Sequence, residues 1–219
     1  MRFRFLSAAA VMLCAAAAAA QISSPTLRCT IPATRPGDFD DLLRPSTPQE
    51  SVRMRQAPRG VIRAGHRLIV HWSHGTRTFR DKPPFDAPLD GVRWSYCGFS
   101  NVFGVHLIGE QNVDVFTGVL LSDKTGAVLP AGEEVSYSPN RLYYLASEQP
   151  DGQDGPTLMV YSRNGRLIWK GYTLAEFASV GWNANNQVIM QVALPSGSLQ
   201  TVTLTEVGTS WQWLPKLAP

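Results

Sequence analysis

Short stretches of alternating apolar and polar residues recur along the chain from Val61 onward. The segment 68–73 places Leu68, Val70 and Trp72 on one face of an extended chain, which is the period of a half-buried strand. Gly, Asn, Asp, Ser or Pro stands at the junctions between such segments, and β-branched and aromatic residues dominate within them. No strong 3.6-residue period appears, so the sequence predicts an all-β fold. Further strands are expected at 103–108, 115–121, 158–161, 167–169, 187–194 and 199–204.

A longer repeat is superimposed on this alternation. The segment Val135–Ala146 recurs in weaker form as Val180–Gln191, and a fainter partner stands at Val92–Tyr96. A turn signal precedes each of the two stronger copies, at Asp123–Gly126 and at Arg163–Gly165. A period of about 40–45 residues that carries several short strands is typical of β-propeller blades.

The first copy resembles a known family. Ser136–Ser147 is similar to the TolB-like, WD40-like propeller repeat, whose first strand and turn typically read F-S-P-D-G-x-x-L-x-Y-x-S. Tyr137 stands for the aromatic residue, whereas Arg141 replaces the glycine and the second copy has lost the proline. The resemblance covers about 30 residues well and about 100 loosely.

The resemblance implies two repeat turns. Ser138, Pro139 and Asn140 would reverse the chain between the first two strands of a blade, and Asn164 and Gly165 would form the closing turn. Closed propellers usually have at least four blades, and about 140 strand-forming residues supply only about three. We therefore expect propeller-like antiparallel blades, incomplete or open unless the N-terminal arm or a second copy completes them. A β-sandwich is the alternative.

The N-terminal segment 1–20 has the features of a secretory signal. Arg2 and Arg4 form a basic start, and an uncharged, alanine-rich stretch runs to Ala20. That stretch is too short and too alanine-rich for a membrane span. Cys14 suggests a lipoprotein signal, but Leu13 precedes it where such signals usually carry a small residue. We expect export to the periplasm or to the outside of the cell, without a membrane span.

Loss of the signal changes the charge and the cysteine count. Of 20 basic and 17 acidic residues, only Arg2 and Arg4 leave, so the mature chain has 18 basic residues against 17 acidic ones. This near-neutral balance argues against a nucleic-acid partner. Two cysteines remain, Cys29 and Cys97, and an oxidising compartment favours a disulfide between them. Two buried thiols are the alternative.

The mature chain divides into an arm and a domain. Six prolines punctuate residues 21–60, which makes a central strand implausible there because proline removes a backbone donor. We interpret this region as an extended arm in which only Asp38–Leu43 could form a helical turn. Residues 61–219 then form the β-repeat domain, interrupted by a polar, proline-rich loop at 80–90.

Candidate chemistry in the domain is weak. His66, His71 and His74 lie close in sequence, but their odd spacings put neighbours on opposite faces of a strand, so no metal site is expected. The acidic loop Asp151–Gly155 lacks the ligand pattern of a calcium loop. No nucleophile elbow, phosphate-binding loop or cofactor motif occurs, so neither a catalytic residue nor a cofactor is predicted.

The leading hypothesis is therefore a non-catalytic, exported β-repeat protein that binds a macromolecular partner, either a protein or a glycan. A hydrolase acting on a glycan or cell-wall component is the alternative, with dispersed acids such as Asp81, Glu110 or Glu148. A periplasmic immunity or inhibitor protein suits the size and compartment equally well.

Overall fold

The protein is all-β, as the sequence predicts. The described residues of the computed structural model form sixteen strands and one α-helix. The strands belong to four antiparallel sheets, whereas the sequence predicts about three blades. The additional sheet is the first one, whose three strands take up only residues 61–80, less than one length of the sequence repeat. The structure describes residues 26–29, 48–83, 91–112, 115–148, 157–172, 177–194 and 196–216.

The first two sheets use residues 61–131. Each is a meander in which consecutive strands pair, so the sequence order is also the spatial order. The first sheet has three strands: β2 (Val61–Ala64), β3 (Arg67–Trp72) and β4 (Gly75–Arg80). The second has four strands: β5 (Val92–Ser100), β6 (Val105–Asn112), β7 (Val115–Ser122) and β8 (Val128–Ala131).

The third and fourth sheets use most of the remaining chain. The third has the order β1-β9-β10-β11-β12, so the N-terminal strand is added at its first edge. Its strands are β1 (Thr26–Arg28), β9 (Glu134–Tyr137), β10 (Tyr143–Glu148), β11 (Thr157–Ser162) and β12 (Leu167–Tyr172). The fourth is a meander of β13 (Phe177–Trp182), β14 (Val188–Ala193), β15 (Leu199–Val207) and β16 (Ser210–Leu214).

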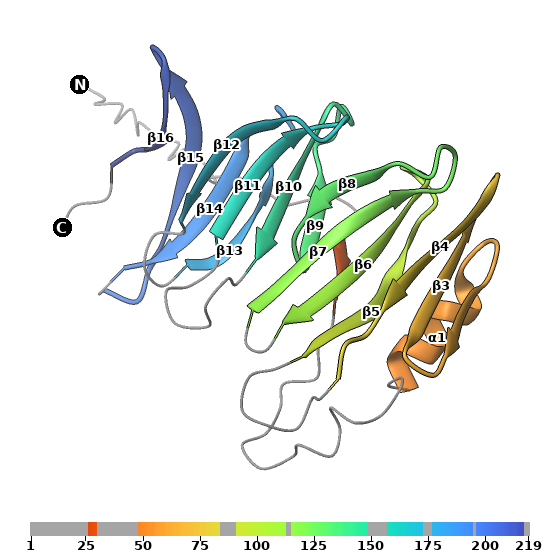
Figure 1. Cartoon of the computed structure of the whole chain (residues 1–219). Helices are drawn as coiled ribbons and strands as arrows, with labels where there is room; N and C mark the ends of the chain where they lie inside the picture. The colour runs from red at the N-terminus through yellow and green to blue at the C-terminus, as the bar shows by residue number, and fades with distance from the viewer. Residues whose placement is uncertain are drawn as a thin grey trace, which may run out of the picture.

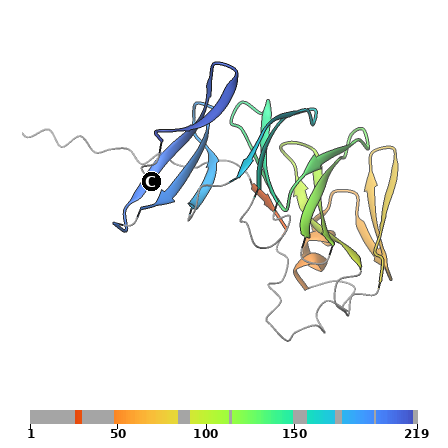
Figure 2. The same ribbon diagram turned by 60° about the vertical axis from the view of Figure 1, so that its left-hand side comes forward.

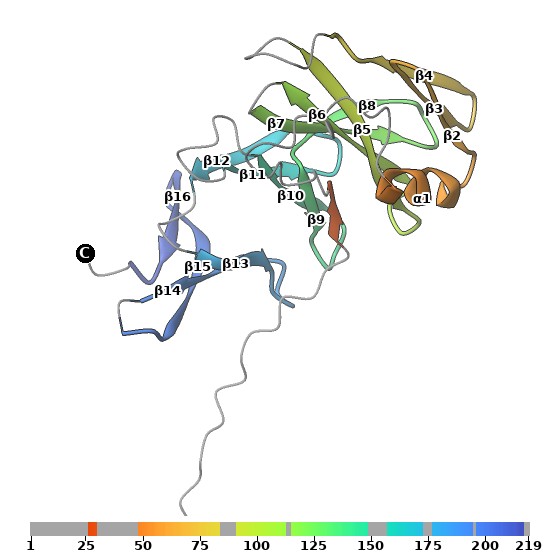
Figure 3. The ribbon, with the colours of Figure 1, turned by 90° about the horizontal axis from the view of Figure 1, so that it is seen from below.

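The four sheets stack in a row that follows the sequence (Figure 1). The first sheet lies at one end of the row and the fourth at the other, and no sheet closes on itself (Figures 1 and 2). Seen from below, the row is curved (Figure 3). Each end of the row therefore presents one sheet face that has no neighbouring sheet.

The core consists of layers between consecutive sheets. Leu68 and Val70 of the first sheet pack with Ile108 of the second, and all three are fully buried. Leu107 and Leu120 face the other way and pack with Tyr144 of the third sheet. Trp182, Val188 and Leu204 of the fourth sheet pack with Leu158 of the third sheet. Burial of each such side chain contributes on the order of 1.5–3 kcal/mol, so these layers hold the row together.

The sequence repeat corresponds to the stacking of the sheets. Its three copies begin at Val92, Val135 and Val180, which lie in β5, β9 and β13, the first meander strand of three consecutive sheets. Tyr137 and Trp182 occupy matching positions and are both buried. The indole of Trp182 donates a hydrogen bond to the Ser136 carbonyl oxygen, at 3.1 Å, so one copy bonds to the next.

The turns that follow β9 and β13 also match. Ser138 Oγ donates to Asn140 Oδ1 at 2.7 Å, and Asn140 Oδ1 also accepts from the Leu142 amide. Arg141, which replaces the glycine of the propeller repeat, has φ 61°, and Asn186 in the second copy has φ 63°. Both positions therefore require the left-handed backbone that glycine adopts most easily. Asn164 and Gly165 lie in the turn between β11 and β12, where Gly165 has φ 84°.

Two elements come from the region expected to be an extended arm. Strand β1 pairs with β9, as an edge strand. Helix α1 (Pro48–Gln56) is not predicted by the sequence analysis. Proline suits its first position, acidic Glu50 lies in its first turn and basic Arg53 and Arg55 in its last, which complements the helix dipole. The signal segment 1–20, the turn at 38–43 and the loop at 151–155 lie outside the described residues.

Candidate functional site

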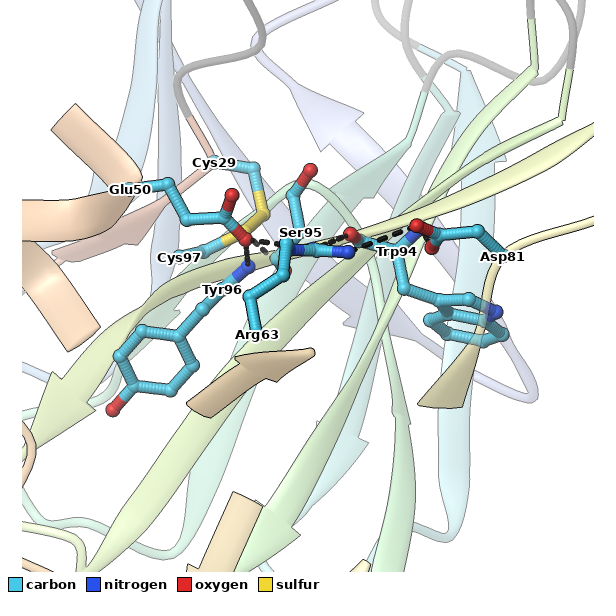
Figure 4. Close-up of polar contacts among 8 residues, drawn as sticks. All are labelled: Cys29, Glu50, Arg63, Asp81, Trp94, Ser95, Tyr96 and Cys97. Atoms are coloured by element: carbon cyan, nitrogen blue, oxygen red, sulfur yellow. Dashed lines mark hydrogen bonds and ion pairs between the residues drawn. A yellow bond between two sulfur atoms is a disulfide. The ribbon is translucent and has the colours of Figure 1, made fainter. Parts of the chain in front are cut away.

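A buried arginine joins the helix to the first two sheets. Arg63 in β2 lies between two carboxylates, and each of the three side chains is only 5% exposed (Figure 4). Arg63 Nη2 donates to Glu50 Oε1 of α1 at 2.9 Å, and Nη1 donates to Asp81 Oδ2, just after β4, at 2.9 Å. A buried charge is tolerated when it is paired and hydrogen-bonded in this way.

This cluster covers the free edge of the second sheet. The edge strand β5 has backbone groups that no neighbouring strand pairs, and unpaired buried groups are costly. The Tyr96 amide donates to Glu50 Oε1 at 2.7 Å, the Trp94 amide donates to Asp81 Oδ1 at 2.9 Å, and Arg63 donates to the Trp94 carbonyl oxygen. Asp81, a candidate acid of the hydrolase hypothesis, thus serves to fasten β5 to the first sheet.

The predicted disulfide is present and involves the same strand. Cys97 of β5 is bonded to Cys29, which follows β1, across 68 residues of sequence. The two sulfurs lie against Gly109 of β6, where a Cβ atom would stand 2.7 Å from Cys29 Sγ. A side chain at position 109 would displace the bridge, so glycine is required there for space. The disulfide is consistent with an oxidising compartment.

A second buried network continues from Tyr96 to the surface. The Tyr96 hydroxyl lies 3.0 Å from Nδ1 of His106, which is fully buried in β6. Burial, with a smaller effect of Asp123, raises the pKa of Tyr96, so its hydroxyl stays protonated. Because the Asp123 carboxylate faces Nε2 of His106, the imidazole carries its proton there, and Nδ1 accepts a hydrogen bond from the Tyr96 hydroxyl. His106 Nε2 lies 3.5 Å from Asp123 Oδ1, and Asp123 in turn accepts from Arg59 Nε at 3.1 Å.

This second network links four segments rather than lining a cleft. Burial lowers the pKa of His106, and Arg59 acts in the same direction while Asp123 opposes it. The imidazole is therefore held neutral, with no exposed atom that a substrate could reach. The sequence does not distinguish His106 as a buried residue, because alternation along one strand does not show that both faces of β6 are covered.

The exposed surface with the most distinctive chemistry lies at the start of the row. The outward side of the first sheet, here called the end face, has no sheet stacked on it (Figure 1). Arg67 stands directly opposite Arg80, and Ile69 lies between Ile62 and Thr78. Ile62 is 50% exposed. The end face contains no acidic residue. Its residues are Ile62, Ala64, Arg67, Ile69, His71, Thr76, Thr78 and Arg80.

Charge is segregated along the chain, and the end face lies in the basic part. Residues 48–82 contain eight basic residues against two acidic ones, Glu50 and Asp81. Residues 21–47 and 83–219 together contain ten basic residues against fifteen acidic ones. Both acids of the basic segment are buried beside Arg63, so they do not balance the exposed arginines. Counting charges by segment reveals this feature in the sequence, whereas the near-zero net charge of residues 21–219 taken together hides it.

The other candidate residues are dispersed. His66 and His74 are exposed at the two turns flanking β3, and His71 lies on the end face. Within the described residues, no group of three His, Cys, Asp or Glu side chains could hold a metal ion. Glu110 lies within β6 and Glu148 ends β10, and these are the second meander strands of neighbouring sheets. Burial raises the pKa of each, while Lys82 lowers that of Glu110 and Lys170 lowers that of Glu148.

Comparisons with known proteins assign no family to this arrangement: no family model, curated protein or solved structure matches the chain. The resemblance to the propeller repeat therefore stays a prediction. Among the described residues, no helix is long and apolar enough to cross a membrane.

Proposed function

We propose that this protein is an exported, non-catalytic β-repeat protein that binds a macromolecular partner through the end face. The observation that carries the proposal is the pair Arg67 and Arg80, which lie directly opposite each other at exposed positions of neighbouring strands. Like charges in that position destabilise a sheet. Within the described part of the chain neither arginine forms an ion pair, so no carboxylate of the fold offsets the repulsion between them.

The buried networks support binding rather than catalysis. Glu50, Arg63 and Asp81 are used to cover the edge of β5, and His106 is enclosed between sheets. Their effect is to hold the first sheet and α1 rigidly on the second sheet. A rigid sheet presents its outer side chains in fixed positions, which lowers the entropic cost of binding.

The test compares two charge-reversed variants of the full exported chain. In one variant Arg67 and Arg80 become glutamate. In the control, Arg163 and Arg166, which are exposed at the turn between β11 and β12, become glutamate, so the net charge is the same. Wild-type protein and both variants are immobilised and exposed to extract from the compartment that contains the protein.

We expect one stoichiometric partner to bind the wild type and the control, and to bind R67E/R80E at least about tenfold more weakly. Equal binding to both variants would show that the end face is not the binding surface. If the captured partner is an enzyme whose turnover falls on binding, the protein acts as an inhibitor or immunity protein.

One observation favours a hydrolase as the second candidate. Glu110 and Glu148 have raised pKa values, as a general acid requires, and lie on corresponding strands of adjacent sheets. Turnover of a glycan panel that is lost in Glu110→Gln or Glu148→Gln, but kept in Glu206→Gln at an exposed position, would establish the enzyme instead.

A further inference from the structure

We infer that the partner presents an acidic protein surface to the end face, with carboxylates placed over Arg67 and Arg80. This inference rests on the proposed function, because it names the chemistry of the partner at the same site. The two guanidinium groups come from directly opposed residues of β3 and β4. Each guanidinium can hold one carboxylate through two parallel hydrogen bonds, so a partner with acidic residues would remove the repulsion between the arginines.

The composition of the end face favours a protein over a polyanion. Its middle row is Ile62, Ile69 and Thr78, which are apolar or weakly polar and partly exposed. Arginine beside exposed aliphatic side chains is characteristic of protein interfaces, where an apolar centre is surrounded by polar residues. A nucleic acid, a sulfated glycan or an anionic lipid surface is bound by dense basic arrays, in which isoleucine would contribute little.

A second copy of this chain is a poorer match. The sheet face at the far end of the row would have to stack on the end face to extend the row. Its outward positions include Ser179, Gln191, Thr201, Thr205 and Gln212, which carry no charge. That face offers no carboxylate to the two arginines.

The area sets the strength of the interaction. Three strands about 4.8 Å apart, with about five residues of 3.3 Å each, give a face of roughly 240 Å². A stable interface buries roughly 800 Å² on each partner, so the contact must extend beyond the face. Because the two arginines contribute through charge, we expect the affinity to fall steeply with salt.

The experiment identifies what touches the end face. A photo-cross-linking amino acid replaces Thr78 in the middle row, in the full chain as it is produced by its own cells. The control carries the same amino acid at Thr201, on the outward side of the fourth sheet. Both are repeated in the R67E/R80E and R163E/R166E backgrounds. Adducts are digested and the cross-linked peptide is sequenced.

We expect an adduct with another protein at Thr78, through a peptide rich in Asp and Glu. The adduct should be absent at Thr201, should fall at least about tenfold with R67E/R80E, and should be unchanged with R163E/R166E. A lipid, glycan or nucleic-acid adduct, or a cross-link to a second copy of this chain, would overturn the inference.

A protein adduct through a peptide without acidic residues, insensitive to R67E/R80E, would also overturn the inference while leaving partner binding intact. No adduct at Thr78, together with no partner in the capture experiment, would remove the proposed function itself.

Discussion

At the scale of single residues, the most informative side chains are the buried polar ones. Tyr96 joins both networks, since its amide donates to Glu50 and its hydroxyl donates to His106. Such groups are costly unless fully bonded, so each of them fixes the position of its partners. The sequence shows these residue types but not their partners, because Glu50, Arg63 and Asp81 are brought together only by the packing of α1 and two sheets.

The first prediction concerns Arg63. Replacement by methionine removes the cation between Glu50 and Asp81 and leaves two buried carboxylates close together. Loss of one partner of a buried pair costs about 3–5 kcal/mol of unfolding free energy. The exposed pair Arg28–Glu134 supplies the control, and Glu134→Gln should cost less than about 1 kcal/mol. Urea denaturation measures both, and equal effects would contradict the structural role of the buried cluster.

The second prediction concerns His106 and pH. Burial lowers its pKa in the folded protein, so the unfolded chain binds the proton more tightly. The stability is therefore complete above the ordinary histidine pKa of about 6.5 and falls as the pH drops from there toward the lower folded-state pKa. Unfolding free energy measured between about pH 7.5 and 5.5 should decline more in the wild type than in His106→Gln.

The same prediction can be checked without a variant. Titration of the His106 imidazole resonances in the folded protein should give a pKa below the ordinary value of about 6.5. Burial also raises the pKa of Glu110, Glu133 and Glu148, which gives the opposite slope at acid pH, but these groups are present in both proteins and cancel in the comparison. A His106 that titrates at the ordinary value would contradict the burial argument.

At the scale of elements, the strands could largely be predicted and the helix could not. The expected segments at 115–121, 187–194 and 199–204 match β7, β14 and β15. Their β-branched residues and flanking turn residues act locally, so a short window of sequence is sufficient. Helix α1 is only nine residues long and has no apolar face of the usual kind, and it is held by Glu50 and by Met54 against the first two sheets. Those contacts are tertiary, which is why the proline-rich sequence alone indicated an arm.

The third prediction concerns the repeat turns. Arg141 has φ 61°, a backbone conformation that costs a non-glycine residue roughly 1–2 kcal/mol. Glycine avoids this cost, but it loses more conformational entropy on folding, which offsets part of the gain. Arg141→Gly should therefore raise the unfolding free energy by about 0.5 kcal/mol.

Asn186 provides the matched control for this turn. It has φ 63° as well, but its Oδ1 accepts a hydrogen bond from the Asn140 amide at 2.7 Å. Asn186→Gly relieves the same backbone strain but loses that hydrogen bond, which is worth about 1 kcal/mol, so the substitution should not stabilise the protein. Thermal unfolding of the two variants tests this, and a stabilising Asn186→Gly would mean that the contact between the two turns is unimportant.

At the scale of the whole molecule, the row of sheets is held together by contacts between segments that are far apart in the sequence. Strand β1 pairs with β9 in the third sheet, and Cys29 just after it is bonded to Cys97 in the second. The N-terminal strand therefore ties two neighbouring sheets together. The number of cysteines and the expected export were sufficient to predict the bridge, but its position between two sheets depends on the pairing of β1, which the sequence does not show.

The last prediction is that this bridge supplies a large part of the stability of the stack. It closes a loop across 68 residues, for which chain entropy gives about 4 kcal/mol as an upper value. That is comparable to a large fraction of the total stability of a typical domain.

Reduction should lower the melting temperature and should also weaken the pairing of β1 with β9, since only three residues of β1 are paired. Hydrogen exchange should then rise at the amides of β9, whose edge β1 covers, and stay slow in β14 and β15, which are remote from the bridge. The variant with serine at both positions 29 and 97 should behave like the reduced protein. Uniform loss of protection over all four sheets would instead show that the row unfolds as one unit, with no separate role for the N-terminal strand.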